Sequence, residues 1–447
     1  MLERMFGLKA RGSTVRRELT AGATTYLTMC YILFVNPLIL GGHPDSTGAS
    51  LSVPGVMTAT AISAGLMCLL MGLYANMPLA LAPGMGLNAV VAVQLVRVLG
   101  LPWPAAMGVI VLEGLLITLL VLTGVREAVM HCIPMSLKRA IGAGIGLFIA
   151  LIGFLEAGFV VRGDGTPLTL GTFWGPAAVA LVGLLITLAL EQRSRPEALL
   201  VGILAATGTA FALNAHQGGH LFAAPGAILP HHWFASPDVS TLGQFDLSAV
   251  SRLGVLFAAL TIFSIMLSDF FDTMGTVIAV GEQAGLVNEK GQMPRLDRIL
   301  LVDSLAAAVG GASGASSVTT YIESASGVGA GGRTGLTAVV TGLLFLFSVF
   351  LNPLAAVVPA QAVAPALIVV GFLMVGAVAG VRWSDSTEAF PAFVTLTGMA
   401  FTNSISAGIG FGVVSYTLLK LVAGKAREVN PALVVVTLGF LLYFATP

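Results

Sequence analysis

Long apolar runs with almost no charge recur along the whole chain, and they constrain its fold more than any other feature. A run of about 17 residues or more can cross a bilayer as a helix. Only 9% of the 447 residues are charged, whereas a soluble protein of this size carries roughly a quarter. The sequence therefore predicts an all-α, polytopic membrane protein.

The apolar runs fall into two sets of seven. The first set covers residues 18–40, 54–74, 77–98, 104–123, 138–157, 172–190 and 197–214. After a polar loop at about 215–247, the second set covers residues 248–285, 299–313, 314–330, 334–352, 363–382, 388–403 and 405–423. These runs predict fourteen crossings. A final apolar segment, 430–446, either crosses once more or lies against the bundle.

The distribution of basic residues predicts the orientation of the chain. With the N-terminus in the cytoplasm, the inner side holds Arg4, Lys9, Arg11, Arg16, Arg17, Arg126, Lys138, Arg139, Arg193, Arg195, Lys290, Arg295, Arg298, Arg333, Arg382, Lys420, Lys425 and Arg427. The outer side holds only Arg97, Arg162 and Arg252. Cytoplasmic loops carry an excess of Lys and Arg. We therefore expect a multi-pass protein of the cytoplasmic (inner) membrane with its N-terminus inside.

Two sets of seven crossings enter the membrane from opposite sides, which is the arithmetic of an inverted repeat. The third run of each set supports this interpretation, because both are interrupted. Residues 77–88 contain Pro78, Pro83, Gly84 and Gly86, and residues 314–324 are small and β-branched before they become helical. Each segment is predicted to be a short extended strand followed by a half-helix. Such interrupted pairs point to a binding site near the bilayer midplane.

Two acids, Asp269 and Asp272, lie three residues apart inside an apolar run. That spacing places both on roughly one face of a helix. A carboxylate in hydrocarbon is costly, so such acids usually face a cavity or a partner. Glu323 and Asn88 follow the two interrupted segments. We therefore predict a central polar cavity to which these four side chains and two half-helix N-termini contribute.

Each of these residues also has a structural interpretation. Asp272 could bond a helix end, and Asp269 could pair with a backbone group. Glu323 could cap its own half-helix. Asn88 could satisfy broken backbone, and Glu113, in the middle of the fourth run, could pair within the bundle.

The predicted cavity contains acids but no basic residue, which bears on the solute. A carrier of sulfate or of a carboxylate would need a cation there. Carboxyl groups and free backbone amides instead suit a neutral, planar solute with N–H donors and ring acceptors. The aromatic residues Phe270, Phe271 or Tyr321 could contact its ring. The formal net charge of zero suggests no nucleic-acid partner, and no metal, cofactor or enzyme motif is found.

Six motifs together resemble the AzgA-like (azaguanine-resistance-type) purine permeases of the nucleobase–cation/nucleobase–ascorbate symporter superfamily. The resemblance runs along almost the whole chain. The motifs are Gly12–Glu18, Tyr31–Pro37, Ala82–Ala89, Phe271–Thr276, Ser317–Ser324 and Gly331–Val339.

The resemblance implies a 7+7 inverted repeat with two moving parts. A core domain would take residues 18–123 and 248–352, and a gate domain residues 138–214 and 363–423. The implied activity is import of purine nucleobases by proton symport, with an elevator-like movement of core against gate. A homodimer through the gate domains follows by analogy alone, so the oligomeric state stays open. The choice between adenine and guanine/hypoxanthine also stays open.

The resemblance also assigns the site. The family's acids of the eighth and tenth segments fall on Asp272 and Glu323, and its third-segment asparagine falls on Asn88. Beyond the resemblance, we predict that Gly86, Thr276 and Thr320 also bind the base and that Asp269 takes part in proton coupling with Asp272 and Glu323. Thr276 stands where uracil-type members have a histidine, so a proton route through that histidine is not expected. The alternative is a same-fold carrier of uracil, xanthine or a sulfate-like anion.

Overall fold

The computed structural model describes residues 2–124, 133–163, 165–216, 222, 226–230, 232–287 and 293–445. Two basic residues assigned above to the inner side, Arg126 and Lys290, lie outside these ranges. Within them, the first half contains α1 Leu2–Phe6, α2 Val15–Met29, α3 Ile32–Leu40, α4 Val53–Leu70, β1 Leu81–Pro83, α5 Met85–Ala89, α6 Trp103–Thr123, α8 Met135–Glu156, β2 Val160–Val161, β3 Thr169–Leu170, α9 Pro176–Glu191 and α10 Ala198–His216.

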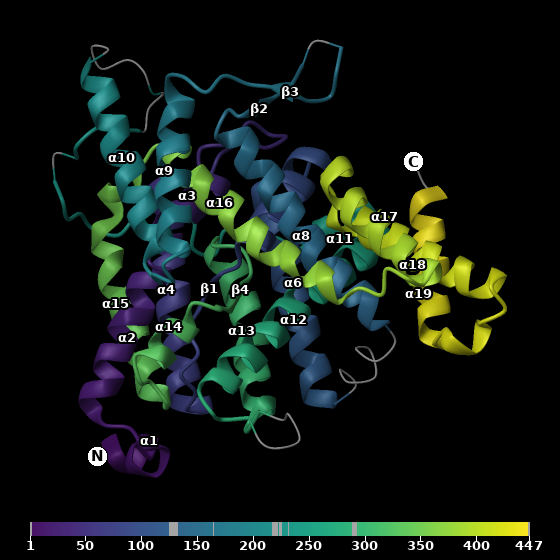
Figure 1. The fold of residues 1–447 in the computed structure, drawn as a ribbon, viewed down its shortest axis with the longest axis horizontal. Helices are drawn as coiled ribbons and strands as arrows, with labels where there is room; N and C mark the ends of the chain where they lie inside the picture. Colours follow the sequence, from purple (N-terminus) through teal and green to yellow (C-terminus); the bar gives the residue numbers. More distant parts are fainter. Residues whose placement is uncertain are drawn as a thin grey trace.

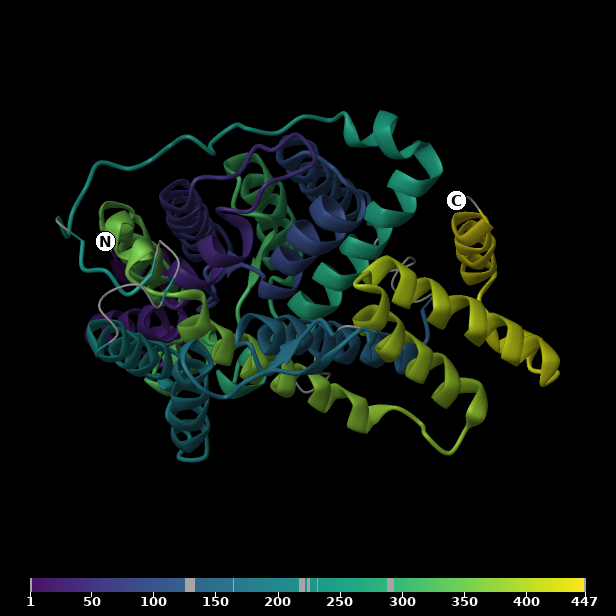
Figure 2. The same cartoon turned by 90° about the horizontal axis from the view of Figure 1, so that it is seen from above.

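The second half contains α11 Ala249–Leu253, α12 Val255–Gln283, α13 Leu296–Ser313, β4 Val318–Thr320, α14 Ser324–Gly329, α15 Gly335–Ser348, α16 Ala360–Val375, α17 Ser386–Thr402, α18 Ile405–Val422 and α19 Pro431–Ala445. The two termini lie at opposite ends of the longest axis (Figure 1 and Figure 2).

The chain folds as an all-helical membrane protein. Nine helices in its described part are long and apolar enough to cross a bilayer: Val15–Leu40, Val53–Ala75, Trp103–Thr123, Met135–Glu156, Ala198–His216, Val255–Gln283, Gly335–Leu354, Ala360–Gly380 and Ile405–Val422. Three more apolar helices are shorter, namely Met85–Val98, Pro176–Glu191 and Pro431–Ala445.

The helix contacts repeat under exchange of the two halves. Among the predicted spans, α6 is the fourth and α13 the ninth, and the two helices pack together. In a repeat of seven spans, the fourth span corresponds to the eleventh, α15, and the ninth corresponds to the second, α4. Helices α15 and α4 also pack together. The pair α9 and α10 corresponds in the same way to α17 and α18. This pattern is that of an inverted repeat.

Strands β1 and β4 lie at the centre of the pattern (Figure 1). They pair antiparallel, with Ala82 opposite Thr319. Each strand is followed by a helix, α5 after β1 and α14 after β4, so each third segment has the expected strand and half-helix. Because extended backbone at membrane depth needs hydrogen-bond partners, the pairing lets each interrupted segment satisfy the other.

Glycines allow the paired helices to approach closely. A Cβ added at Gly342 of α15 would lie 2.7 Å from the carbonyl oxygen of Gly65 in α4. A Cβ at Gly114 of α6 would lie 2.8 Å from the Cα of Ala308 in α13. Small residues at such contacts let backbones pack without an intervening side chain, as is common between membrane helices.

Two segments differ from the simplest prediction. The first span is two helices, because the backbone turns at Cys30 and Tyr31 between α2 and α3. The final apolar segment forms α19, which packs against α12 and α18. The described end of the long polar loop follows an extended path to α11 (Figure 2), where Thr241 donates its hydroxyl to the carbonyl of Gly55 at 3.2 Å.

Candidate functional site

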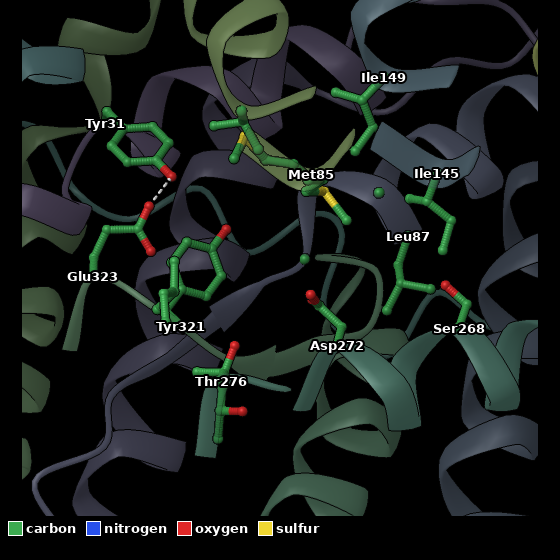
Figure 3. Close-up of a pocket in the computed structure, with 16 residues that line it drawn as sticks. Tyr31, Met85, Leu87, Ile145, Ile149, Ser268, Asp272, Thr276, Tyr321 and Glu323 are labelled. Carbon is green, nitrogen blue, oxygen red and sulfur yellow. Dashed lines mark hydrogen bonds between the residues drawn. The ribbon is translucent and has the colours of Figure 1, made fainter. Parts of the chain in front are cut away.

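A cavity of about 100 Å³ lies between α12 and the ends of the two strands. Helix α12 contributes Ser268, Asp272 and Thr276, which follow one another at helical spacing and face the cavity (Figure 3). Asp272 is an exposed residue, whereas Thr276 is buried. The cavity therefore presents one solvent-accessible acid beside buried hydroxyl groups.

The second acid of the cavity is held by a tyrosine. Glu323 is the residue that precedes α14, and its carboxylate accepts a 2.6 Å hydrogen bond from the hydroxyl of Tyr31 (Figure 3). Tyr31 itself is fully buried at the turn between α2 and α3. A hydroxyl donor favours and orients the charged form of a carboxyl group. Glu323, in the second half of the chain, is thus positioned by Tyr31 from the first predicted span.

The strand pair forms one wall of the cavity. The hydroxyl of Tyr321 donates to the carbonyl of Pro83 at 2.5 Å, and the amide of Tyr321 donates to the carbonyl of Ala80 at 2.9 Å. The amide of Gly84 donates to Ser317 at 2.9 Å. These bonds place the start of α5, at Met85, against the cavity. The first amides of a helix have no intrahelical acceptor and carry a partial positive charge.

The opposite wall is apolar. It consists of Ile145 and Ile149 from α8 and Val370 and Met374 from α16. No basic side chain is found among the described residues that line the cavity. The site thus combines carboxyl groups and helix amides on one wall with a hydrocarbon surface on the other.

The cavity opens into a wide vestibule of about 1170 Å³. The vestibule shares Asp272, Thr276 and Glu323 with the cavity and extends to Lys138 and Arg139 near the start of α8. At the other end of α8, a separate space of about 30 Å³ is lined by residues that include His43, Arg97 and Glu156. The site is therefore much more open toward the end of the molecule at which α8 begins.

The structure brings together five of the predicted site residues. Of the residues predicted to form the site, those that line the cavity are Gly86, Asp272, Thr276, Thr320 and Glu323. Of the three aromatic residues considered, Tyr321 lines it, whereas Phe270 and Phe271 line only the vestibule.

Asn88 and Asp269 are not among the lining residues. Asn88 is fully buried in α5, and its side-chain amide has no hydrogen-bond partner among the described residues. Asp269 does not line the cavity beside Asp272. Asp269 is turned about 60° around the helix axis from Asp272, and it lies near Glu113 of α6 and Asp303 of α13.

Sequence reasoning missed Tyr31 and the apolar wall. A signal for Tyr31 was present, because a tyrosine inside an apolar span usually finds a partner for its hydroxyl. The partner was not predictable, since it lies 292 positions away. Ile145 and Met374 carried no signal beyond ordinary hydrophobic packing. No cluster of three His, Cys, Asp or Glu residues in the described ranges could hold a metal ion.

Comparisons of the sequence with known proteins point to one transporter family. Residues 16–411 match the model of the xanthine/uracil-type "Permease family". The chain is 43% identical to the adenine permease AdeP of Escherichia coli over 99% of this chain and 95% of that protein. It is 40% identical to the guanine/hypoxanthine permease PbuO of Bacillus subtilis over 98% of this chain and 99% of that protein.

A solved structure shares the fold. The transmembrane domain of the cyanobacterial bicarbonate transporter BicA superimposes with a TM-score of 0.62 at 15% identity. The match covers 88% of this chain and 96% of that domain. At this identity the similarity concerns the 7+7 inverted-repeat fold alone.

Proposed function

This chain belongs to the permease family, among its AzgA-like nucleobase permeases, and from that membership we propose that it imports purine nucleobases by proton symport. It is a membrane transporter and not an enzyme. The relatives named for adenine and for guanine/hypoxanthine are similarly close. The substrate class is therefore the purine base, and the preferred base is decided by the test below.

The observation that carries the proposal is the contrast between the two cavity walls. A purine is flat, with N–H donors on its edges and ring nitrogen or carbonyl acceptors. Asp272 and Glu323 would accept from its donors, and the first amides of α5 would donate to its acceptors. Ile145 and Met374 would cover a ring face. Buried groups left unpaired by a wrong base would each cost about 1–3 kcal/mol, which is a source of selectivity.

Transport requires access from each side in turn. We assign fourteen crossings, with the N-terminus and the vestibule on the cytoplasmic side of the inner membrane. The structure is then inward-facing. The strands, α12 and their neighbours would form the core, and α8–α10 with α16–α18 the gate, which could also form a homodimer. An elevator-like shift of core against gate would close the vestibule beside Lys138 and open the small space beside Arg97.

Proton coupling follows from the acids of the site. Burial in a medium of low dielectric favours the neutral form of a carboxyl group. Asp272, Glu323 and Asp269 are the candidate carriers. An anion carrier of the same fold is disfavoured, because the described residues of the cavity offer no cation to pair with a charged solute.

Uptake into inside-negative, right-side-out membrane vesicles tests the proposal. Radiolabelled adenine, hypoxanthine and guanine are supplied with and without an imposed pH gradient, and each is competed by the others and by sulfate. We expect uptake of at least one purine, driven by an acidic exterior and insensitive to sulfate. Uptake indifferent to the gradient contradicts proton symport, and inhibition by sulfate but not by purines contradicts the substrate class.

Asp272→Asn and Glu323→Gln test the site in the same vesicles. We expect both to lose purine uptake, because each removes an acceptor from the polar wall. The matched control is Glu282→Gln, which changes an exposed acid on the same helix. Full uptake by both site variants would contradict the assignment of the cavity as the base site.

A further inference from the structure

Two acids behind the cavity are buried without any of the partners that stabilise a buried charge. Glu113 of α6 is 0% exposed and Asp269 of α12 is 1% exposed. Among the described residues, none of their four carboxyl oxygens has a hydrogen-bond partner. Ser317 lies beside Glu113 and Thr319 beside Asp269, but neither contact reaches hydrogen-bond geometry.

The charged groups around the two acids are also acidic. Glu113 interacts through space with Asp303 of α13, and Asp269 interacts with Glu113, Asp303 and Asp272. Among the described residues, no basic side chain forms an ion pair with either acid. Burying an uncompensated charge costs several kcal/mol. The two carboxyl groups therefore cannot both be ionised in this state.

Asp303 differs from the other two members of this group. Its carboxylate accepts hydrogen bonds from the hydroxyl of Thr273 at 2.7 Å, the amide of Thr320 at 3.0 Å and the hydroxyl of Thr319 at 3.4 Å. Three donors suit a charged carboxylate. Asp303 thus supplies a fixed negative charge beside Glu113 and Asp269.

The acids in the cavity are better suited to the base than to the proton. Glu323 has the hydroxyl of Tyr31 as a donor, and Asp272 is open to the water of the vestibule. Both line the cavity and can accept from the N–H groups of a purine. Glu113 and Asp269 have no hydrogen-bond donor among the described residues, and neither lines the cavity or the vestibule.

From this geometry we propose that Glu113 and Asp269 form a proton-holding pair that carries the coupled proton, separate from the acids that bind the base. The inference rests on the proposed proton symport and names its carrier. In the transfer, an O–H bond of a hydronium ion or of protonated Asp272 breaks, and an O–H bond to one oxygen of the pair forms. The reverse step releases the proton on the other side, and the base is chemically unchanged.

Strand β4 connects the pair to the base. Thr320 lines the cavity, and its amide bonds Asp303. A base that moves this strand would change the donors of Asp303 and hence the field at Glu113 and Asp269. Asp269 is also one helical turn from Asp272, with which it interacts electrostatically. Base binding and proton binding are thereby linked without a shared atom.

Glu113→Gln and Asp269→Asn separate coupling from base binding, since each mimics a permanently protonated acid. Radiolabelled purine counterflow, which needs no net proton movement, should persist in both variants. With one proton per base, a gradient of about one pH unit supports about tenfold accumulation, because one unit corresponds to about 1.36 kcal/mol. The wild type and the Glu282→Gln control should reach this value, and both pair variants should equilibrate without accumulation.

The outcomes distinguish the two proposals. If the wild type exchanges purines but does not accumulate them, the proton symport proposed above is wrong. If the wild type and both variants accumulate purine equally, the proposed symport stands and the assignment of the proton to Glu113 and Asp269 is wrong.

Infrared difference spectra guard against a misfolded variant. The wild type at neutral pH should show a protonated-carboxyl carbonyl band that each pair variant weakens and Glu282→Gln does not. The absence of such a band in the wild type would overturn the proposal that Glu113 and Asp269 hold a proton.

Discussion

The hydroxyl of Tyr31 donates a 2.6 Å hydrogen bond to the carboxylate of Glu323, although 292 positions separate the two residues in the chain. The bond joins the turn between α2 and α3 to the start of α14. It fixes the orientation of an acid that faces the cavity (Figure 3).

Tyr31→Phe removes this donor and leaves the ring in place. Hydrogen bonds to charged groups contribute about 1.5–3 kcal/mol, so we expect KM for the purine to rise about tenfold or more. Initial-rate uptake checks the value. The control is Tyr26→Phe in α2, which removes a 2.6 Å hydrogen bond between Tyr26 and Ser348 of α15, away from the cavity. Equal effects of the two substitutions would contradict a specific role for Tyr31.

Gly86→Ala should impair uptake by closing the gap between the two cavity walls. An added Cβ would lie 2.8 Å from the Cγ2 of Ile145 and 3.4 Å from the Cδ1 of Ile149. Overpacking of this kind costs about 1–3 kcal/mol, and here it presses α5 against α8. Gly208→Ala in α10 is the control, because a Cβ there meets no atom within 4 Å. Normal transport by Gly86→Ala would show that the walls separate freely.

Lys420→Met should destabilise the C-terminal helices. Lys420 is fully buried, with its Nζ 2.6 Å from Glu428 and 3.7 Å from Glu388. Glu428 is half-exposed and Glu388 keeps Arg382 as a partner, so we expect less than the cost of about 3–5 kcal/mol that is typical when a buried charge is left uncompensated. Thermal unfolding in detergent measures the effect. Lys425→Met, at a half-exposed lysine 3.4 Å from Asp385, should change Tm much less.

Asp385 should contribute a pH-dependent stabilisation only in strong acid. The hydroxyl and amide of Thr387, together with Lys425, lower the pKa of Asp385 to about 2. A lowered folded-state pKa gives stability that is complete above the unfolded value of about 3.9 and is lost as pH falls through the folded value. The Tm difference between wild type and Asp385→Asn should therefore stay constant from about pH 8 to pH 5 and shrink below the unfolded pKa. A difference that changes near neutral pH would contradict this assignment.

Several features of the fold could be predicted from the sequence. The ends of α4, α6 and α18 agree with the predicted spans to within a few residues, because a lipid-spanning helix must be apolar over a set length. The strand after Ala80 was predicted because Pro83 and the neighbouring glycines disfavour a continuous helix there. The strand after Ser317 was predicted because the residues there are small and β-branched. Asp272 and Glu323 were predicted as site residues because an intramembrane acid needs a cavity or a partner.

The neighbours of each side chain were decided only by the tertiary structure. Helical spacing relates Asp269 to Asp272 within one helix. A turn of about 60° around the helix axis nevertheless places Asp269 near Glu113 and Asp272 at the cavity. The sequence likewise placed Tyr31 in a span without indicating Glu323. The physical reason is that local sequence sets the angle of a side chain around its own helix. The group that it meets there comes from helices distant in the sequence, which are brought together by close contacts such as that of Gly114 with Ala308.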